Sequence, residues 1–74
     1  MEEYERTQIE SLLDRDAELR DLWKEHLQLE VRIAEIEAMP HLSPTESLTR
    51  KQLQKQKLAG KDKIAEIVAR LSNG

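Results

Sequence analysis

A series of apolar residues at helical spacing constrains the fold of this chain more than any other feature. Its members are Leu19, Leu22, Leu29, Ile33 and Ile36, with His26 completing the series. Consecutive members lie three or four residues apart, which is the alternation of a helix that packs along another helix. The spacing predicts a long helix over residues 16–39 that ends before Pro40, because proline disfavours helical geometry in the preceding residue. Asp14 and Asp16 are both candidate N-caps for this helix.

A second helix start follows at Ser43-Pro44-Thr45-Glu46. Serine at the N-cap, proline at the first helical position and glutamate at the third form a capping box. The only helix breaker between this motif and Asn73-Gly74 is Gly60. The pattern predicts a second long helix over residues 44–71. Because the linker, residues 40–43, is short, the two helices are expected to be antiparallel neighbours.

The two predicted helices define an expected hairpin core. This core comprises Leu19, Leu22, His26, Leu29, Ile33, Ile36, Leu53, Ile64, Ile67 and Leu71. If the chain turns near His41, Leu22 lies opposite Gly60. A glycine inside a helix costs about 1 kcal/mol relative to alanine. Two interpretations of Gly60 stay open: a bulky side chain, Trp23 or Leu22, fills the space left by the missing Cβ, or the glycine is a mild defect.

The N-terminal segment, residues 2–13, has a weaker pattern. Ile9, Leu12 and Leu13 form a small apolar cluster, but Arg15 occupies the position that would carry the apolar series into the first long helix. The segment is therefore either a short helix of its own or a frayed extension of that helix.

The size of the chain bears on whether such a hairpin is stable alone. A chain of 74 residues without cysteine has no disulfides, and proteins this small usually add a metal or a second copy. Two glycines and two prolines are too few for the frequent turns of an all-β protein. No apolar run approaches the ~20 residues that cross a bilayer, and the acidic opening residues are unlike a secretory signal. We expect a single all-α unit over residues 1–74, soluble and cytoplasmic, that does not act at a membrane.

The apolar face of the first long helix is wider than one neighbouring helix covers. Four further residues extend this face beyond the regular series: Trp23, Leu27, Val31 and Ala34. Together they widen the apolar arc to roughly 220°, against the ~100° of a helix that faces a single core. The N-terminal segment, a second copy or a foreign protein must then cover these four residues. We favour the first two together, which gives a homo-oligomer, a dimer of hairpins. The alternative is a monomer with scattered exposed aliphatic residues.

Charge is divided unevenly along the chain. Residues 1–43 contain 12 acidic and 5 basic residues, and residues 44–74 contain 3 acidic and 7 basic residues. An acidic first helix folded against a basic second helix is complementary to itself. The basic residues, among them Arg50, Lys51, Lys55, Lys57, Lys61 and Lys63, also support an alternative function as a small nucleic-acid-binding regulator. Against that function stand the net charge of −3 and the lack of aromatic residues between the lysines.

The sequence offers little for catalysis or metal binding. His26 is the one polar residue of the first apolar series, and it is a register-fixing residue, a pH-responsive group or a metal ligand. We favour the first interpretation, because metal sites need several converging ligands and the other histidine, His41, lies in the linker. Phosphate-binding glycine loops are excluded by the presence of only two glycines. We expect no catalytic residue, cofactor or metal.

Two stretches of the chain resemble a known family. The first is Leu22-Trp23-Lys24-Glu25-His26-Leu27-Gln28-Leu29, and the second is Lys57-Leu58-Ala59-Gly60-Lys61-Asp62-Lys63-Ile64. Both are similar to the YdcH-like family of short, uncharacterised bacterial proteins, with Gly60 in place of a leucine of the family pattern. The resemblance covers most of residues 12–71 and implies a helical hairpin of bacterial origin without a known activity. Together with the width of the apolar face, it predicts a non-enzymatic, self-associating protein-interaction module.

Overall fold

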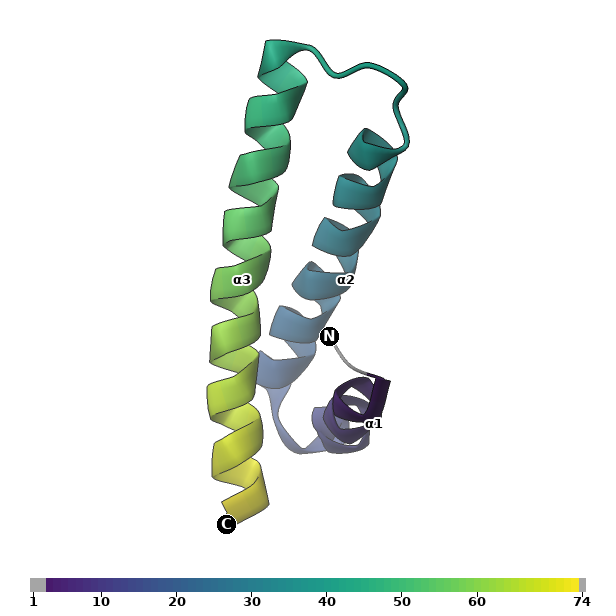
Figure 1. The fold of residues 1–74 in the computed structure, drawn as a ribbon. Helices are drawn as coiled ribbons and strands as arrows, with labels where there is room; N and C mark the ends of the chain where they lie inside the picture. The colour runs from purple at the N-terminus through teal and green to yellow at the C-terminus, as the bar shows by residue number, and fades with distance from the viewer. Residues whose placement is uncertain (1–2, 74) are drawn as a thin grey trace.

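The computed structural model describes residues 3–73, which form three α-helices and one 3-10 turn and contain no β-strand. The elements are α1 (Glu3–Leu12), the 3-10 turn η1 (Leu13–Arg15), α2 (Ala17–Glu37) and α3 (Pro44–Asn73). The predicted all-α class is confirmed. Figure 1 shows α2 and α3 side by side and running in opposite directions, with α1 packed near the C-terminal end of α3.

The N-terminal segment is a helix of its own. Extended backbone at Asp16, with φ −151° and ψ 118°, separates η1 from α2. The Asp16 side chain accepts a hydrogen bond from the backbone N–H of Leu19 at 2.9 Å, so Asp16, rather than Asp14, is the N-cap of α2. Arg20 donates to the carbonyl oxygen of Leu13 at 3.1 Å and so satisfies an acceptor of the turn. Residue 2, where the predicted segment begins, lies outside the described residues.

The other helix ends follow the sequence signals closely. α2 ends at Glu37, two residues before the predicted limit. At the start of α3, Ser43 Oγ accepts from the Glu46 N–H at 3.1 Å, and Glu46 Oε1 accepts from the Ser43 N–H at 3.0 Å. This is the predicted capping box. The hydrogen bonds from the Ser43 backbone and hydroxyl lower the pKa of the Glu46 carboxyl below its ordinary value.

The main core lies where all three helices meet. Its buried residues are Ile9, Leu19, Trp23, Ile64 and Ile67, surrounded by the half-buried Leu12, Leu13, Leu22, Leu27, Val68 and Leu71. Nearer the loop, where α2 and α3 are the only helices within residues 3–73, Ile33 and Leu53 are the buried apolar residues. The buried residues of α2 and α3 follow the helical spacing along both long helices.

Each of the ten residues predicted for the hairpin core is at least half-buried. Six are buried, namely Leu19, His26, Ile33, Leu53, Ile64 and Ile67, and four are half-buried, namely Leu22, Leu29, Ile36 and Leu71. The set omitted Ile9 of α1 and Trp23 of α2, both of which are buried. Within residues 3–73, no helix combines the length and the apolar character that a membrane span requires.

Candidate interaction surface

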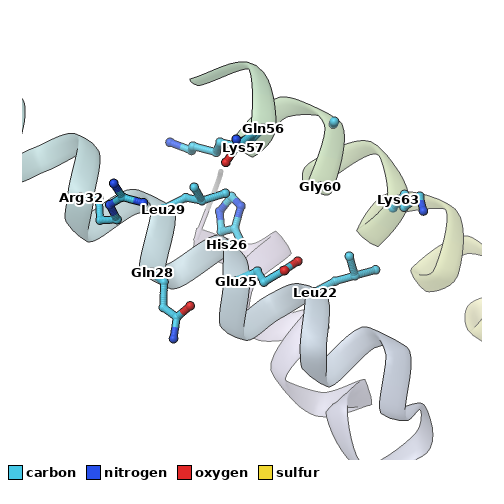
Figure 2. Close-up of a pocket in the computed structure, with 11 residues that line it drawn as sticks. Leu22, Glu25, His26, Gln28, Leu29, Arg32, Gln56, Lys57, Gly60 and Lys63 are labelled. Carbon is cyan, nitrogen blue, oxygen red and sulfur yellow. The ribbon is translucent and has the colours of Figure 1, made fainter. Parts of the chain in front are cut away.

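His26 lies in the middle of α2 and points into the seam between α2 and α3 (Figure 2). Only 2% of the residue is exposed. Its ring stacks on that of Trp23, with the ring centroids 5.5 Å apart and an interplanar angle of 11°. Residues three apart on a helix share one side, so this stacking is a local consequence of the sequence. Trp23 belongs to the core of the three-helix region, and His26 is buried beside it.

Glu30 is the charged neighbour of the buried imidazole. His26 Nε2 lies 2.6 Å from Glu30 Oε1, yet neither ring nitrogen has a partner in hydrogen-bonding geometry. The Glu30 carboxylate is nevertheless the nearest charged group to the ring, and its charge and hydrogen bonding favour the protonated imidazole. Burial lowers the pKa of His26 below its ordinary 6.5, the Glu30 carboxylate opposes this shift, and the Lys57 ammonium adds to it. The net direction is downward, so the ring is neutral near pH 7.

Arg6 of α1 contacts both Trp23 and Glu30. Its guanidinium carbon lies 5.5 Å from the centroid of the Trp23 ring, within the range of a cation–π interaction. Its Nη2 also lies 3.5 Å from Glu30 Oε2. α1 therefore contacts α2 through Trp23 and Glu30, and it covers the indole.

A groove opens on the opposite side of the seam, around Gly60 (Figure 2). Its apolar lining consists of Leu22, Leu29, Ala59 and Gly60, with His26 between the two helices. Its polar lining consists of Glu25, Gln28, Arg32, Gln56, Lys57 and Lys63. We call this surface the Gly60 groove. A Cβ built on Gly60 meets no atom within 4 Å, so the hypothesis that Trp23 or Leu22 fills this space is wrong.

The angular positions of the α2 residues show that α1 and the Gly60 groove occupy two different sides. With His26 as zero and 100° per residue, Trp23 and Glu30 lie at about +60° and +40°. Leu22 and Leu29, which line the groove, lie at about −40° and −60°. α1 covers the first side, and no described residue covers the second. Leu22 and Leu29 consequently remain half-buried.

The structure separates the four residues that the sequence assigned to self-association. Trp23 is buried with Arg6 of α1 over its ring, so the N-terminal segment, one of the covers that the sequence left open, covers this residue. Leu27 is half-buried against the three-helix core. Val31 is 59% exposed, and Ala34 is also exposed. The width of the apolar face thus has an explanation within the chain: the N-terminal helix covers its central part.

Sequence patterns alone did not indicate Arg6, Glu30 or the groove itself. Glu30 had a detectable signal, because it follows His26 by four residues and such pairs meet on one helix side. Arg6 had none, since its contact with Trp23 depends on how α1 packs. Among residues 3–73, no group of three metal-ligating side chains converges, and His41 is exposed in the loop.

The basic residues of α3 do not form a single stripe. Lys51, Lys55 and Lys63 are exposed, whereas Arg50, Lys57 and Lys61 are half-buried. With Gly60 as zero, Lys57 and Lys63 lie at about +60° and −60°, and Lys51 lies near 180°. The positive charge is therefore spread around the helix.

Comparison with known proteins gives one family. No curated protein and no solved structure matches the chain significantly. The model of a family described as a protein of unknown function, DUF465, matches residues 19–68. This match includes His26, Glu30 and the whole Gly60 groove, and it excludes α1 and η1. The chain therefore belongs to the DUF465 family, the YdcH-like family that its two sequence stretches resemble.

Proposed function

We propose that this protein is a non-enzymatic interaction module that associates with a second copy of itself through the Gly60 groove. The observation that carries the proposal is the open side of the α2–α3 pair, where Leu22 and Leu29 are half-buried beside a glycine with free space above it. Covering such a surface gains about 25 cal/mol for each Å² of apolar area removed from water. A second copy that covers this side would therefore add to the stability of a chain whose own core is small.

The composition of the groove favours binding over catalysis. The group with acid–base chemistry near neutral pH is the His26 imidazole, and it is almost completely buried between the helices. A general base must come within about 3 Å of the proton that it takes. The remaining lining consists of aliphatic, amide and charged side chains without a hydroxyl or thiol nucleophile.

The proposal is tested by the mass of the particle in solution. Multi-angle light scattering and sedimentation equilibrium, over a range of micromolar concentrations, should give twice the chain mass of 8.6 kDa. A mass that stays at one chain throughout this range would reject self-association.

A second candidate function, nucleic-acid binding, is supported by the seven basic residues of α3. These residues are spread around α3, whereas a phosphate backbone contacts one face of a helix. Nucleic-acid binding is therefore the weaker of the two proposals. Titration with mixed RNA at low and moderate salt decides between them. Salt-dependent binding would support this second function, and no binding at low salt would reject it.

A further inference from the structure

We infer that two copies pack face to face with α2 of each copy over α3 of the other, so that Leu22 of one copy enters the Gly60 groove of its partner. The inference rests on the proposed self-association and specifies its geometry. The result is a four-helix bundle with both α1 helices on the outside, because α1 and the groove lie on different sides of the α2–α3 pair.

Charge selects this arrangement from the two that symmetry allows. Two identical helix pairs that meet face to face are related by a two-fold axis either along the helices or across them. The first axis places α2 over the partner's α3, and the second places like helices together. α2 carries six acidic and three basic residues, and α3 carries three acidic and seven basic residues. The first arrangement therefore pairs an acidic helix with a basic one, whereas the second pairs like with like.

The axis along the helices also fixes which residues meet. It leaves each residue at the same height along the bundle, so the level of Leu22 in one copy coincides with the level of Leu22 in the other. Within one chain, Leu22 and Gly60 line the same groove. Leu22 of the partner then lies directly above Gly60, where a Cβ would find no atom within 4 Å. The missing side chain of one copy is replaced by the leucine of the other.

The edges of this interface have matching charges. Glu18 lies one helical turn before Leu22 on the groove side of α2, at about −80° from His26. Lys63 lies three residues after Gly60 on the groove side of α3 and lines the groove. Both side chains are exposed. In the proposed arrangement, Glu18 of each copy faces Lys63 of the other.

The first test fills the groove from within. Gly60→Leu should place an aliphatic side chain where the partner's Leu22 would lie, and it should raise the dissociation constant of the dimer by at least about tenfold. Gly60→Ala is the matched control: it removes the same helical glycine but leaves most of the groove open, so association should change little. Both variants should melt at or above the temperature of the parent, which excludes unfolding as the cause. Unchanged dimerisation of Gly60→Leu would overturn the inference.

The second test distinguishes contacts between copies from contacts within one chain. Glu18→Lys and Lys63→Glu should each weaken self-association by about tenfold, since every dimer contains the contact twice. An equimolar mixture should recover dimers, because the lysine introduced in one variant then faces the glutamate introduced in the other. The second contact of the same mixed dimer pairs the unchanged Glu18 with the unchanged Lys63. Native mass spectrometry identifies these mixed dimers.

Three outcomes decide the question. Recovery in the mixture supports the proposed arrangement. A dimeric parent whose mixed variants stay as weak as each variant alone overturns the inference but leaves self-association standing, whereas a monomeric parent rejects both.

Val31→Glu serves as a further control, because Val31 points away from the groove and its substitution should leave the dimer unchanged. A loss of dimers in Val31→Glu, without a loss in Gly60→Leu, would move the interface to the other side of α2.

Discussion

The two ends of the long helix pair differ in how many helices surround their core. Near the C-terminus of α3, α1 joins α2 and α3, and five apolar residues are buried together there. Near the loop, α2 and α3 are the only helices of the described residues, and Ile33 and Leu53 are the buried apolar residues of that end. Val31, Met39 and Leu48 are exposed toward the loop. We call these regions the three-helix end and the loop end.

The difference shows what a third helix contributes to a small chain. Two antiparallel helices cover only part of each other, so apolar residues at the edges of their stripes stay accessible. α1 covers one edge at the three-helix end and so buries Trp23. The other edge, which contains Leu22 and Leu29 of the Gly60 groove, has no such cover within the described chain. In the proposed dimer, the second copy covers Leu22 and Leu29 as α1 covers Trp23.

The largest expected effect compares leucine truncations at the two ends. Leu19 is 0% exposed at the three-helix end, and Leu53 is 4% exposed at the loop end. Leu19→Ala should lower the free energy of unfolding by about 4 kcal/mol, because three helices hold the cavity open. Leu53→Ala should lower it by about 2–3 kcal/mol, since two helices can close around the gap. Urea unfolding followed by circular dichroism, at one fixed protein concentration, measures both. Equal losses would remove the distinction between the two ends.

How much of this could be predicted from the sequence differs between the ends. The stripes of α2 and α3, the N-cap at Asp16 and the capping box at Ser43 depend on neighbours within four residues, and periodicity and local side-chain chemistry predict them. The burial of Trp23 depends on where a separate helix packs, and a helical wheel shows only that something must cover the indole. The Gly60 groove could not be predicted from the sequence for a similar reason. A glycine in a stripe indicates missing volume, but only the distance between the helices shows whether a neighbour fills it.

The second prediction tests the loop end through its helix cap. Ser43→Ala removes the acceptor for the Glu46 N–H and should lower the free energy of unfolding by about 1 kcal/mol. Ser43→Thr keeps a hydroxyl and should recover most of this loss. Hydrogen exchange should show faster exchange in the first turn of α3 while amides at the three-helix end stay protected. Equal acceleration at both ends would mean that the two ends unfold as one unit.

The third prediction concerns how α1 is held at the three-helix end. Arg6→Ala removes the cation over Trp23 and the partner of Glu30, and it should cost about 0.5–1 kcal/mol. Arg6→Lys keeps a cation but not the planar guanidinium, and its effect should be smaller. Trp23 is the only tryptophan, so its fluorescence reports directly on this site. We expect a shift to longer wavelength and easier quenching in Arg6→Ala. An unchanged spectrum would show that the apolar contacts of Ile9 and Leu12 are enough to hold α1 in place.

The smallest expected effect is a dependence of the free energy of unfolding on pH. His26 contributes to it at the three-helix end, and Glu46 contributes at the loop end. The pKa of His26 is lowered below 6.5 in the folded chain, mainly by burial, with Glu30 opposing and Lys57 and Arg6 facing the same cluster. Between the lowered pKa and 6.5 the unfolded chain binds more protons, so stability falls as the pH falls through this window. The pKa of Glu46 is lowered below 4.5 by Ser43, so its contribution is present above 4.5 and is lost in more acidic solution.

The two contributions occur in separate pH ranges and can be removed one at a time. His26→Gln should flatten the stability curve just below pH 6.5 and leave its acidic limb unchanged. Glu46→Gln should flatten the acidic limb and leave the range of His26 unchanged, because the cap at Ser43 lies at the far end of the molecule from Trp23. Thermal melts across this pH range measure both limbs. If His26→Gln leaves the slope just below pH 6.5 unaltered, the buried imidazole does not couple proton binding to the folding of the three-helix end, and Glu30 compensates the burial of the charged ring.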